Sequence, residues 1–188
     1  MGCDIHLHLE RRKIANSQDN LKHEWRRCQI IGYGGEWSDR IYGMFALLAN
    51  VRNYSDYEPI EQRGFPTDAD YRTKLLYSLR VIPDEEYEKY SYYEDGRYCK
   101  KSQADKWIRQ GCSKPIEIVE GSEYITGPDW HSPNWCTAKE MEQCVTQLFF
   151  RDGEWIGDYF EWKILSDVMN LYEESGEYEC RAVFWFDN

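Results

Sequence analysis

MGCDIHLHLE, residues 1–10, alternates apolar and ionisable side chains, and this alternation limits how the rest of the chain can be arranged. The apolar members are Ile5, Leu7 and Leu9. Four ionisable residues occupy the positions around them: Asp4, His6, His8 and Glu10. Because side-chain direction in a β-strand repeats every two residues, the stretch predicts a strand with one face for a core and one face of ionisable groups.

The order Asp-x-His of residues 4–6 recurs at residues 129–131. Carboxylates and imidazoles are the usual ligands of catalytic Zn²⁺, Mn²⁺ or Fe²⁺, and three or four of them leave room for a bound water. We therefore expect four residues to hold a divalent metal ion: Asp4, His6, Asp129 and His131. We also expect His131 to take part in catalysis. The alternative is structural, with two of these residues on a strand surface and two fastening a loop by hydrogen bonds.

His8 and Glu10 extend the ionisable face of the first strand. Either could serve as a further ligand or proton acceptor, but we expect both to be solvated where the strand leaves the site. A catalytic cysteine is a further alternative, pairing Cys3 with His6 or Cys136 with His131. A regular strand would point Cys3 away from His6, which makes the first pair a minor hypothesis.

Arginines and tryptophans provide candidates for a ligand-binding site. A guanidinium fork matches phosphate or carboxylate, so we expect Arg52 and Arg63, with Asn53, to bind an anion. Trp130 and Trp135 could stack on a nucleobase. The structural alternatives are arginines that tie a loop to carbonyls or carboxylates, and tryptophans that pack in a core.

The composition is that of a globular protein: 41% of the 188 residues are hydrophobic and 16% aromatic. The net charge of −11 disfavours long nucleic acids as partners but leaves small anions possible. The sequence shows no apolar run long enough to span a membrane. Seven cysteines without a C-x-x-C pair fit reduced thiols, so we expect a cytoplasmic protein.

Apolar spacing predicts helices over four stretches, 38–51, 68–79, 137–148 and 159–172, with a shorter helix ending at Gly111. Strands are expected at 1–10, 25–31, 115–119 and 180–188, whereas prolines on either side of 129–131 predict an extended loop there. We expect an α+β fold of one domain, 1–188, in which a small mixed or antiparallel sheet containing both terminal strands packs against about four helices. A Tyr- and Glu-rich subregion at about 84–121 could be an insertion. Asp187 would then lie near the opening motif.

Several motifs together resemble an uncharacterised family of tailed-phage and prophage proteins. They are the opening MGCDIH, residues 42–46 with 51–53, the RGFP turn at 63–66, the block 129–137 and the closing FWFDN. This chain departs from the family at His8 and Cys136, where the family has an aromatic or aliphatic residue and a leucine. The resemblance implies a phage-encoded protein of the host cytosol, without an activity that can be transferred.

Two hypotheses follow for function. The first is a metal-dependent hydrolase of a small phosphorylated or nucleotide-like molecule, in which metal-bound water is the nucleophile. The second is a non-catalytic protein, either a sponge that binds a nucleotide signal or an inhibitor of a host defence protein.

Overall fold

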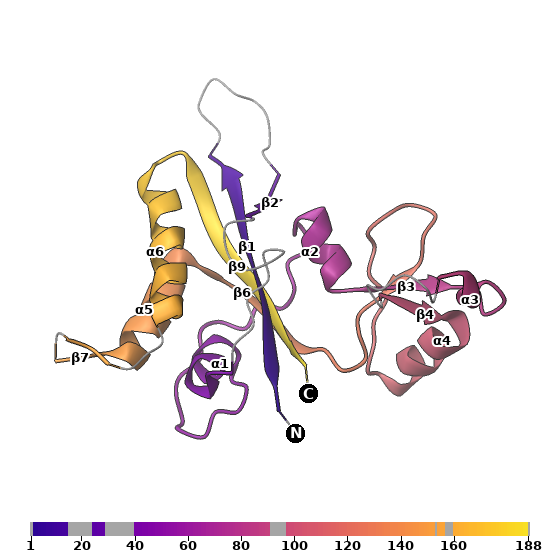
Figure 1. The fold of residues 1–188 in the computed structure, drawn as a ribbon, viewed down its shortest axis with the longest axis horizontal. Helices are drawn as coiled ribbons and strands as arrows, with labels where there is room; N and C mark the ends of the chain where they lie inside the picture. The colour runs from indigo at the N-terminus through magenta and orange to yellow at the C-terminus, as the bar shows by residue number, and fades with distance from the viewer. Residues whose placement is uncertain are drawn as a thin grey trace. The chain divides into compact units, whose positions relative to one another are not determined.

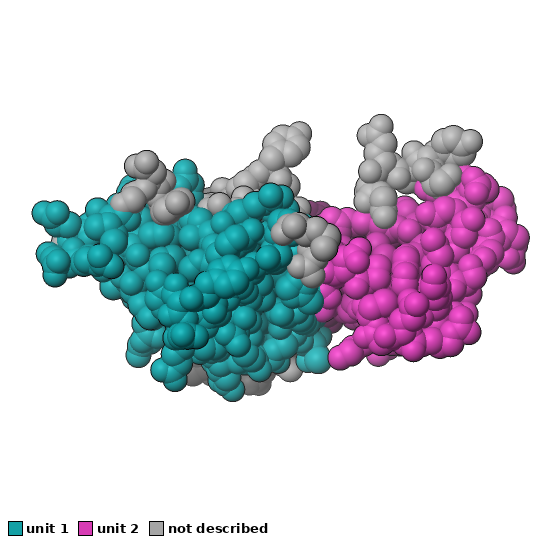
Figure 2. All heavy atoms as spheres, turned by 90° about the horizontal axis from the view of Figure 1, so that it is seen from below, with its two compact units in different colours: residues 1–70, 131–188 teal, residues 71–130 magenta. Residues whose placement is uncertain are grey.

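The computed structural model of the chain describes residues 2–14, 24–28, 40–90, 97–152, 154–156 and 160–187. These residues form two compact units, residues 1–70 with 131–188 and residues 71–130 (Figure 2). The predicted α+β class is confirmed, with both terminal strands in one sheet. Six helices occur among the described residues; five correspond to the four predicted stretches and the shorter helix ending at Gly111, and the short helix at Tyr87–Tyr90 was not foreseen.

The first unit is built on a four-stranded sheet in the order β2-β1-β9-β6. Its strands are β1 Asp4–Lys13, β2 Arg26–Arg27, β6 His131–Thr137 and β9 Tyr178–Asp187. The two long strands, β1 and β9, pair antiparallel along their whole length (Figure 1). Asp4 lies opposite Asp187 in this register, so the predicted proximity of Asp187 to the opening motif is confirmed. The predicted strand at 25–31 contributes only β2; its residues 29–31 lie outside the described residues.

The core of the first unit lies on the apolar face of this sheet. Ile5, Leu7 and Leu9 of β1 and Phe184 and Phe186 of β9 are all buried there. Three helices supply the opposing apolar side chains: α1 Tyr42–Ala49, α5 Ala138–Phe149 and α6 Phe160–Glu174 (Figure 1). Burying each large apolar side chain contributes about 1.5–3 kcal/mol relative to exposure, so the alternation of β1 fixes which face of the strand turns inward.

Strand β6 corrects the expectation of an extended loop at 129–131. Residues from His131 onward pair with β9, and the register shifts between His131 and Asn134. Pro133 has no N–H to donate and is tolerated because β6 is the edge strand and the pairing is interrupted there. The two prolines correctly indicated that strand pairing is irregular here, but the segment does pair with β9.

The helix ends follow local sequence signals. Thr137 caps α5, its side chain accepting a hydrogen bond from the Glu140 amide, while the Glu140 side chain accepts one from the Thr137 amide. These two reciprocal hydrogen bonds form a capping box at the start of the helix. A short hairpin follows α5, formed by β7 Phe150–Arg151 and β8 Glu154–Trp155. Helix α1 begins at Tyr42; residues 38 and 39, at which the predicted helix starts, lie outside the described residues.

The second unit, residues 71–130, has its own sheet, in the order β4-β3-β5. Its elements are α2 Tyr71–Leu76, β3 Leu79–Ile82, α3 Tyr87–Tyr90, β4 Tyr98–Lys100, α4 Lys101–Gln110 and β5 Tyr124–Ile125. The predicted helix at 68–79 is shorter than expected because Leu79 already belongs to β3. The strand expected at 115–119 is wrong: the region makes only an isolated bridge from Pro115 to Ile125. The subregion proposed at 84–121 falls within this unit.

Candidate functional site

The ionisable face of β1 carries two hydrogen-bonded acid–base pairs. Arg40 binds Asp4 through two of its nitrogens, and the distance from Arg40 Nη2 to Asp4 Oδ2 is 2.8 Å. The hydrogen bond from Arg40 holds the pKa of the Asp4 carboxyl below its ordinary value of 3.8. Asp4 is therefore ionised at neutral pH and committed to a guanidinium.

The second pair joins His6 to the far end of the chain. His6 Nε2 lies 3.0 Å from Asp187 Oδ2, and the imidazole stacks on Trp185 with ring centroids 5.6 Å apart. The Asp187 carboxylate also accepts a hydrogen bond from the Asp4 amide. A carboxylate held against one ring nitrogen orients an imidazole, which is the arrangement used by proton-transfer and metal-binding histidines.

His8 and Glu10 are fully buried, which corrects the expectation that they are solvated. The His8 ring tilts against Trp185 at 4.9 Å. Glu10 accepts hydrogen bonds from Arg181 Nε at 2.9 Å and from the Asp70 amide at 2.8 Å. Glu10 therefore fastens the segment before the second unit to the sheet and takes no part in an open site.

A different group of side chains gathers behind the start of β1. Cys3 Sγ lies 4.0 Å from His131 Nε2, and His131 Nδ1 lies 3.1 Å from Ser132 Oγ. The Arg52 guanidinium lies near enough to the Cys3 thiol to favour a lower pKa for it. Burial nevertheless raises the pKa of the Cys3 thiol above 9.0, against the lowering effect of Arg52, so the thiol is protonated at neutral pH. Cys3 is thus a poor nucleophile as it stands.

The four expected metal ligands do not come together as one set. The rings of His6 and His131 stack on Trp185 and Phe186 respectively, and successive residues of a strand point to opposite faces of its sheet. Asp129 is an exposed residue of the second unit. Within the described part of the chain, no three His, Cys, Asp or Glu side chains are arranged to hold a metal ion.

The expected anion-binding residues divide into two groups. Arg52 belongs to the group around Cys3, with its guanidinium 5.6 Å from the ring centroid of Tyr42. Arg63 instead has a structural role: it donates to both carboxylate oxygens of Glu140, at 2.6 and 3.0 Å, and to the carbonyl of Trp135. Asn53 is also structural, since its side chain bonds within its own loop.

Both tryptophans proposed for base stacking are engaged in packing. Trp135 lies against the Arg63 guanidinium at 4.7 Å and the Arg181 guanidinium at 5.6 Å. Trp130, in the second unit, stacks on Tyr77 at 5.9 Å. The structural alternative given by the sequence therefore describes these two residues better than base stacking.

We call the side chains that surround the start of β1 and the end of β9, on both faces of the sheet, the strand-end cluster; its members are Cys3, Asp4, His6, Arg40, Arg52, His131 and Asp187. Sequence reasoning did not propose Arg40. Little in the sequence points to Arg40, because the residue precedes α1 and lies 36 positions after Asp4 in the chain. Only the fold brings the two together.

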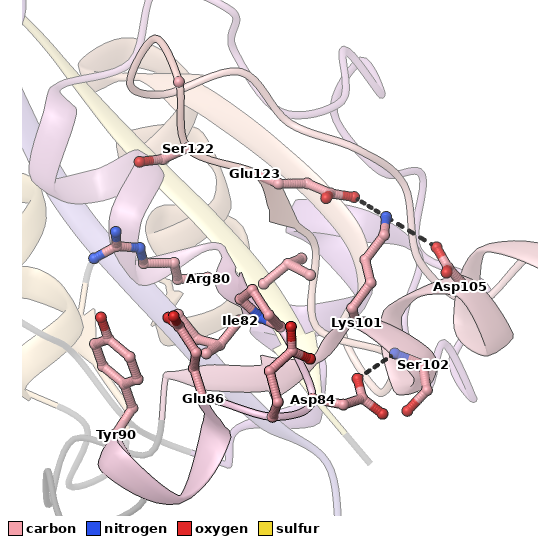
Figure 3. Close-up of a pocket in the computed structure, with 14 residues that line it drawn as sticks. Arg80, Ile82, Asp84, Glu86, Tyr90, Lys101, Ser102, Asp105, Ser122 and Glu123 are labelled. Atoms are coloured by element: carbon pink, nitrogen blue, oxygen red, sulfur yellow. Dashed lines mark hydrogen bonds and ion pairs between the residues drawn. The ribbon is translucent and has the colours of Figure 1, made fainter.

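A separate hollow of about 730 Å³ lies in the second unit (Figure 3). Its lining is strongly acidic, but several of these charges are engaged locally. Lys101 lies 2.6 Å from Glu123 and 3.0 Å from Asp105, and Asp84 accepts a hydrogen bond from the Ser102 amide at the start of α4. Much of the charge around the hollow is therefore paired in contacts that support helix α4.

No protein-family model, curated protein or solved structure matches this chain. Among the described residues, no helix combines the length and the apolar composition needed to cross a bilayer.

Proposed function

We propose that this protein binds a small phosphate-bearing molecule at the strand-end cluster. The observation that supports the proposal most directly is that a guanidinium lies near each face of β1 at its start, Arg40 bonded to Asp4 and Arg52 near Cys3, in a chain whose net charge is −11. A guanidinium offers five N–H donors in a planar fork that fits phosphate oxygens. Arg40 accompanies the His6–Asp187 pair on one face of the sheet, whereas Arg52 and His131 both approach Cys3 on the other, so a small anion on the Cys3 side would meet Arg52 and His131.

In the two acid–base pairs, each carboxylate orients its basic partner. Asp4 and Asp187 hold Arg40 and His6 in defined positions, so that binding requires little ordering of side chains. Taken with the resemblance to phage proteins, these features favour a sponge for a phosphorylated molecule of the infected cell.

Titration with inorganic pyrophosphate at low ionic strength tests the proposal, because pyrophosphate carries the anionic chemistry without an organic part. We expect calorimetric binding to the intact protein, weakened at least ten-fold by Arg52→Gln, since the lost contact is a charge-assisted hydrogen bond. Arg26→Gln is the matched control: its side chain is 73% exposed and paired with Glu24. Absence of binding to the intact protein, or equal weakening by both substitutions, would show that the cluster is not the site.

Metal-dependent hydrolysis at the same place is the second candidate, and the His6–Asp187 pair favours it. An imidazole oriented by a carboxylate can bind a metal or accept a proton from water. The candidate predicts bound Mn²⁺ or Zn²⁺ after dialysis, measured by mass spectrometry of the metal, and release of nitrophenolate from bis(p-nitrophenyl) phosphate. Both should be lost in His6→Ala. A protein that binds pyrophosphate but retains no metal and releases no product is a binder.

A further inference from the structure

The loop that follows α1 is held in an unusual backbone conformation. Asn50, Arg52 and Asp56 have positive φ angles of 57°, 52° and 52°, a region that residues other than glycine adopt at some cost. Such a conformation persists only when surrounding contacts impose it. The contacts of this loop therefore hold its exposed side chains in place.

Asn53 supplies the contacts that fix the loop. Its side-chain amide donates to Asn50 Oδ1 at 2.9 Å and to the Tyr57 carbonyl at 2.7 Å, and its side-chain oxygen accepts from the Tyr57 amide at 2.9 Å. The Tyr54 amide donates to the Arg52 carbonyl at 2.9 Å. Both Arg52 and Tyr54 are thus presented by a loop whose shape is set before any ligand arrives.

Tyr54 is the most exposed large aromatic side chain among the described residues, with 75% of its surface accessible. Its hydroxyl lies 3.4 Å from Arg52 Nη1, and its ring meets that of Tyr42 edge-on, with centroids 6.5 Å apart. A single exposed aromatic residue is common on protein surfaces. Here, however, the ring is fixed in direction and lies beside a guanidinium of the strand-end cluster.

We propose that Tyr54 is the stacking platform for a nucleobase, so that the molecule bound at the strand-end cluster is a nucleotide; this inference rests on the proposed function. Arg52 and Tyr54 are two residues apart, which places their Cα atoms within about 7 Å. One nucleotide can therefore present its phosphate to the arginine and its base to the ring. Stacking does not depend on base identity, since every base has a π-face.

Calorimetric titrations with two probes, ADP and inorganic pyrophosphate, test this inference. ADP carries the same diphosphate as the second probe, with a base added, so we expect the intact protein to bind ADP more tightly. Tyr54→Ala should weaken ADP binding about ten-fold and leave pyrophosphate binding unchanged, because Asn53 still fixes the loop that carries Arg52. Tyr54→Phe keeps the ring and should keep ADP binding. Tyr71→Ala, which removes an exposed tyrosine of the second unit, is the matched control and should change neither.

The outcomes separate the two proposals. If pyrophosphate does not bind the intact protein, the proposed function fails and the nucleotide inference fails with it. If pyrophosphate binds but ADP binds no more tightly, or Tyr54→Ala does not weaken ADP, the proposed function stands and base stacking is overturned. Equal weakening of both probes by Tyr54→Ala would show that the residue acts by positioning Arg52, which also overturns stacking.

Discussion

Glu10 and Arg181 form an ion pair that is almost completely removed from water. Their side chains are 0% and 4% exposed, with Arg181 Nη2 2.8 Å from Glu10 Oε2. Arg181 also binds Asp68 at 2.9 Å and lies over the ring of Trp25 at 4.0 Å. Desolvation offsets much of the attraction within such a pair, but removing Glu10 leaves the buried charge of Arg181 offset by Asp68, whose side chain is 59% exposed.

Glu10→Gln should therefore lower the free energy of unfolding by about 3–5 kcal/mol, measured by urea denaturation at pH 7. Glu24→Gln is the control, because Glu24 is 77% exposed in its pair with Arg26 and such surface pairs contribute about 0–1 kcal/mol. Losses of similar size in the two variants would contradict the structural role given to Glu10.

Residue-level prediction from sequence succeeded where strand alternation was sufficient. It placed Asp4 and His6 on a common face, with Asp187 nearby. It failed for Glu10, because alternation identifies the face of a strand but not the segment that covers it; Arg181 and the Asp70 amide come from elsewhere in the chain. It failed to find Arg40 for the same reason.

At the scale of single elements, α5 is stabilised at its first turn by a network around Glu140. The carboxylate accepts from the Thr137 amide at 2.9 Å and from both terminal nitrogens of Arg63. Burial raises the pKa of Glu140, but the hydrogen bonds from Arg63 and Thr137 outweigh burial and hold it below the ordinary value of 4.5. A carboxyl whose pKa is lower in the folded chain stabilises the fold above its unfolded pKa. That stabilisation is lost as pH falls through the folded pKa.

Glu140→Gln should consequently reduce stability by about 2 kcal/mol at pH 7, since hydrogen bonds to charged groups are the strong ones. The difference between intact protein and variant should shrink as the pH falls below 4.5, because the intact protein then loses the same charge. Denaturant titrations at pH 7 and pH 3 measure both values. A difference of the same size at pH 3 would mean that the charge of Glu140 is not what stabilises α5.

Elements were predictable where one local signal was enough, as for the apolar spacing of α5 and the apolar run of β9. Strand β6 was not predictable, because the sequence shows its prolines but not the strand with which it pairs. Whether Pro133 is compatible with a strand depends on its lying at an edge and at a break in the pairing, and both are properties of the assembled sheet.

At the scale of the whole molecule, the two compact units have separate cores of very different size. The buried cluster of the first unit spans β1, β9 and helices α1, α5 and α6. The cluster of the second unit contains four buried residues: Val81, Cys99, Ala104 and Ile125. Composition pointed to a distinct region near 84–121, but the chain leaves the first unit at Asp70, where no change in composition marks the boundary.

Because so few apolar side chains hold the second unit, its backbone should open with a smaller free energy than that of β1 and β9. We expect hydrogen exchange followed by mass spectrometry to show faster exchange in β3 and β5 than in the paired long strands. Ile125 is fully buried, so Ile125→Ala should remove about 2–5 kcal/mol locally and abolish most protection within residues 71–130. Protection of β1 and β9 should be unchanged, since the strand-end cluster and its core belong wholly to the first unit. Equal loss of protection in β1 would instead mean that the units unfold as one, and that any ligand stabilising the strand-end cluster also stabilises the second unit.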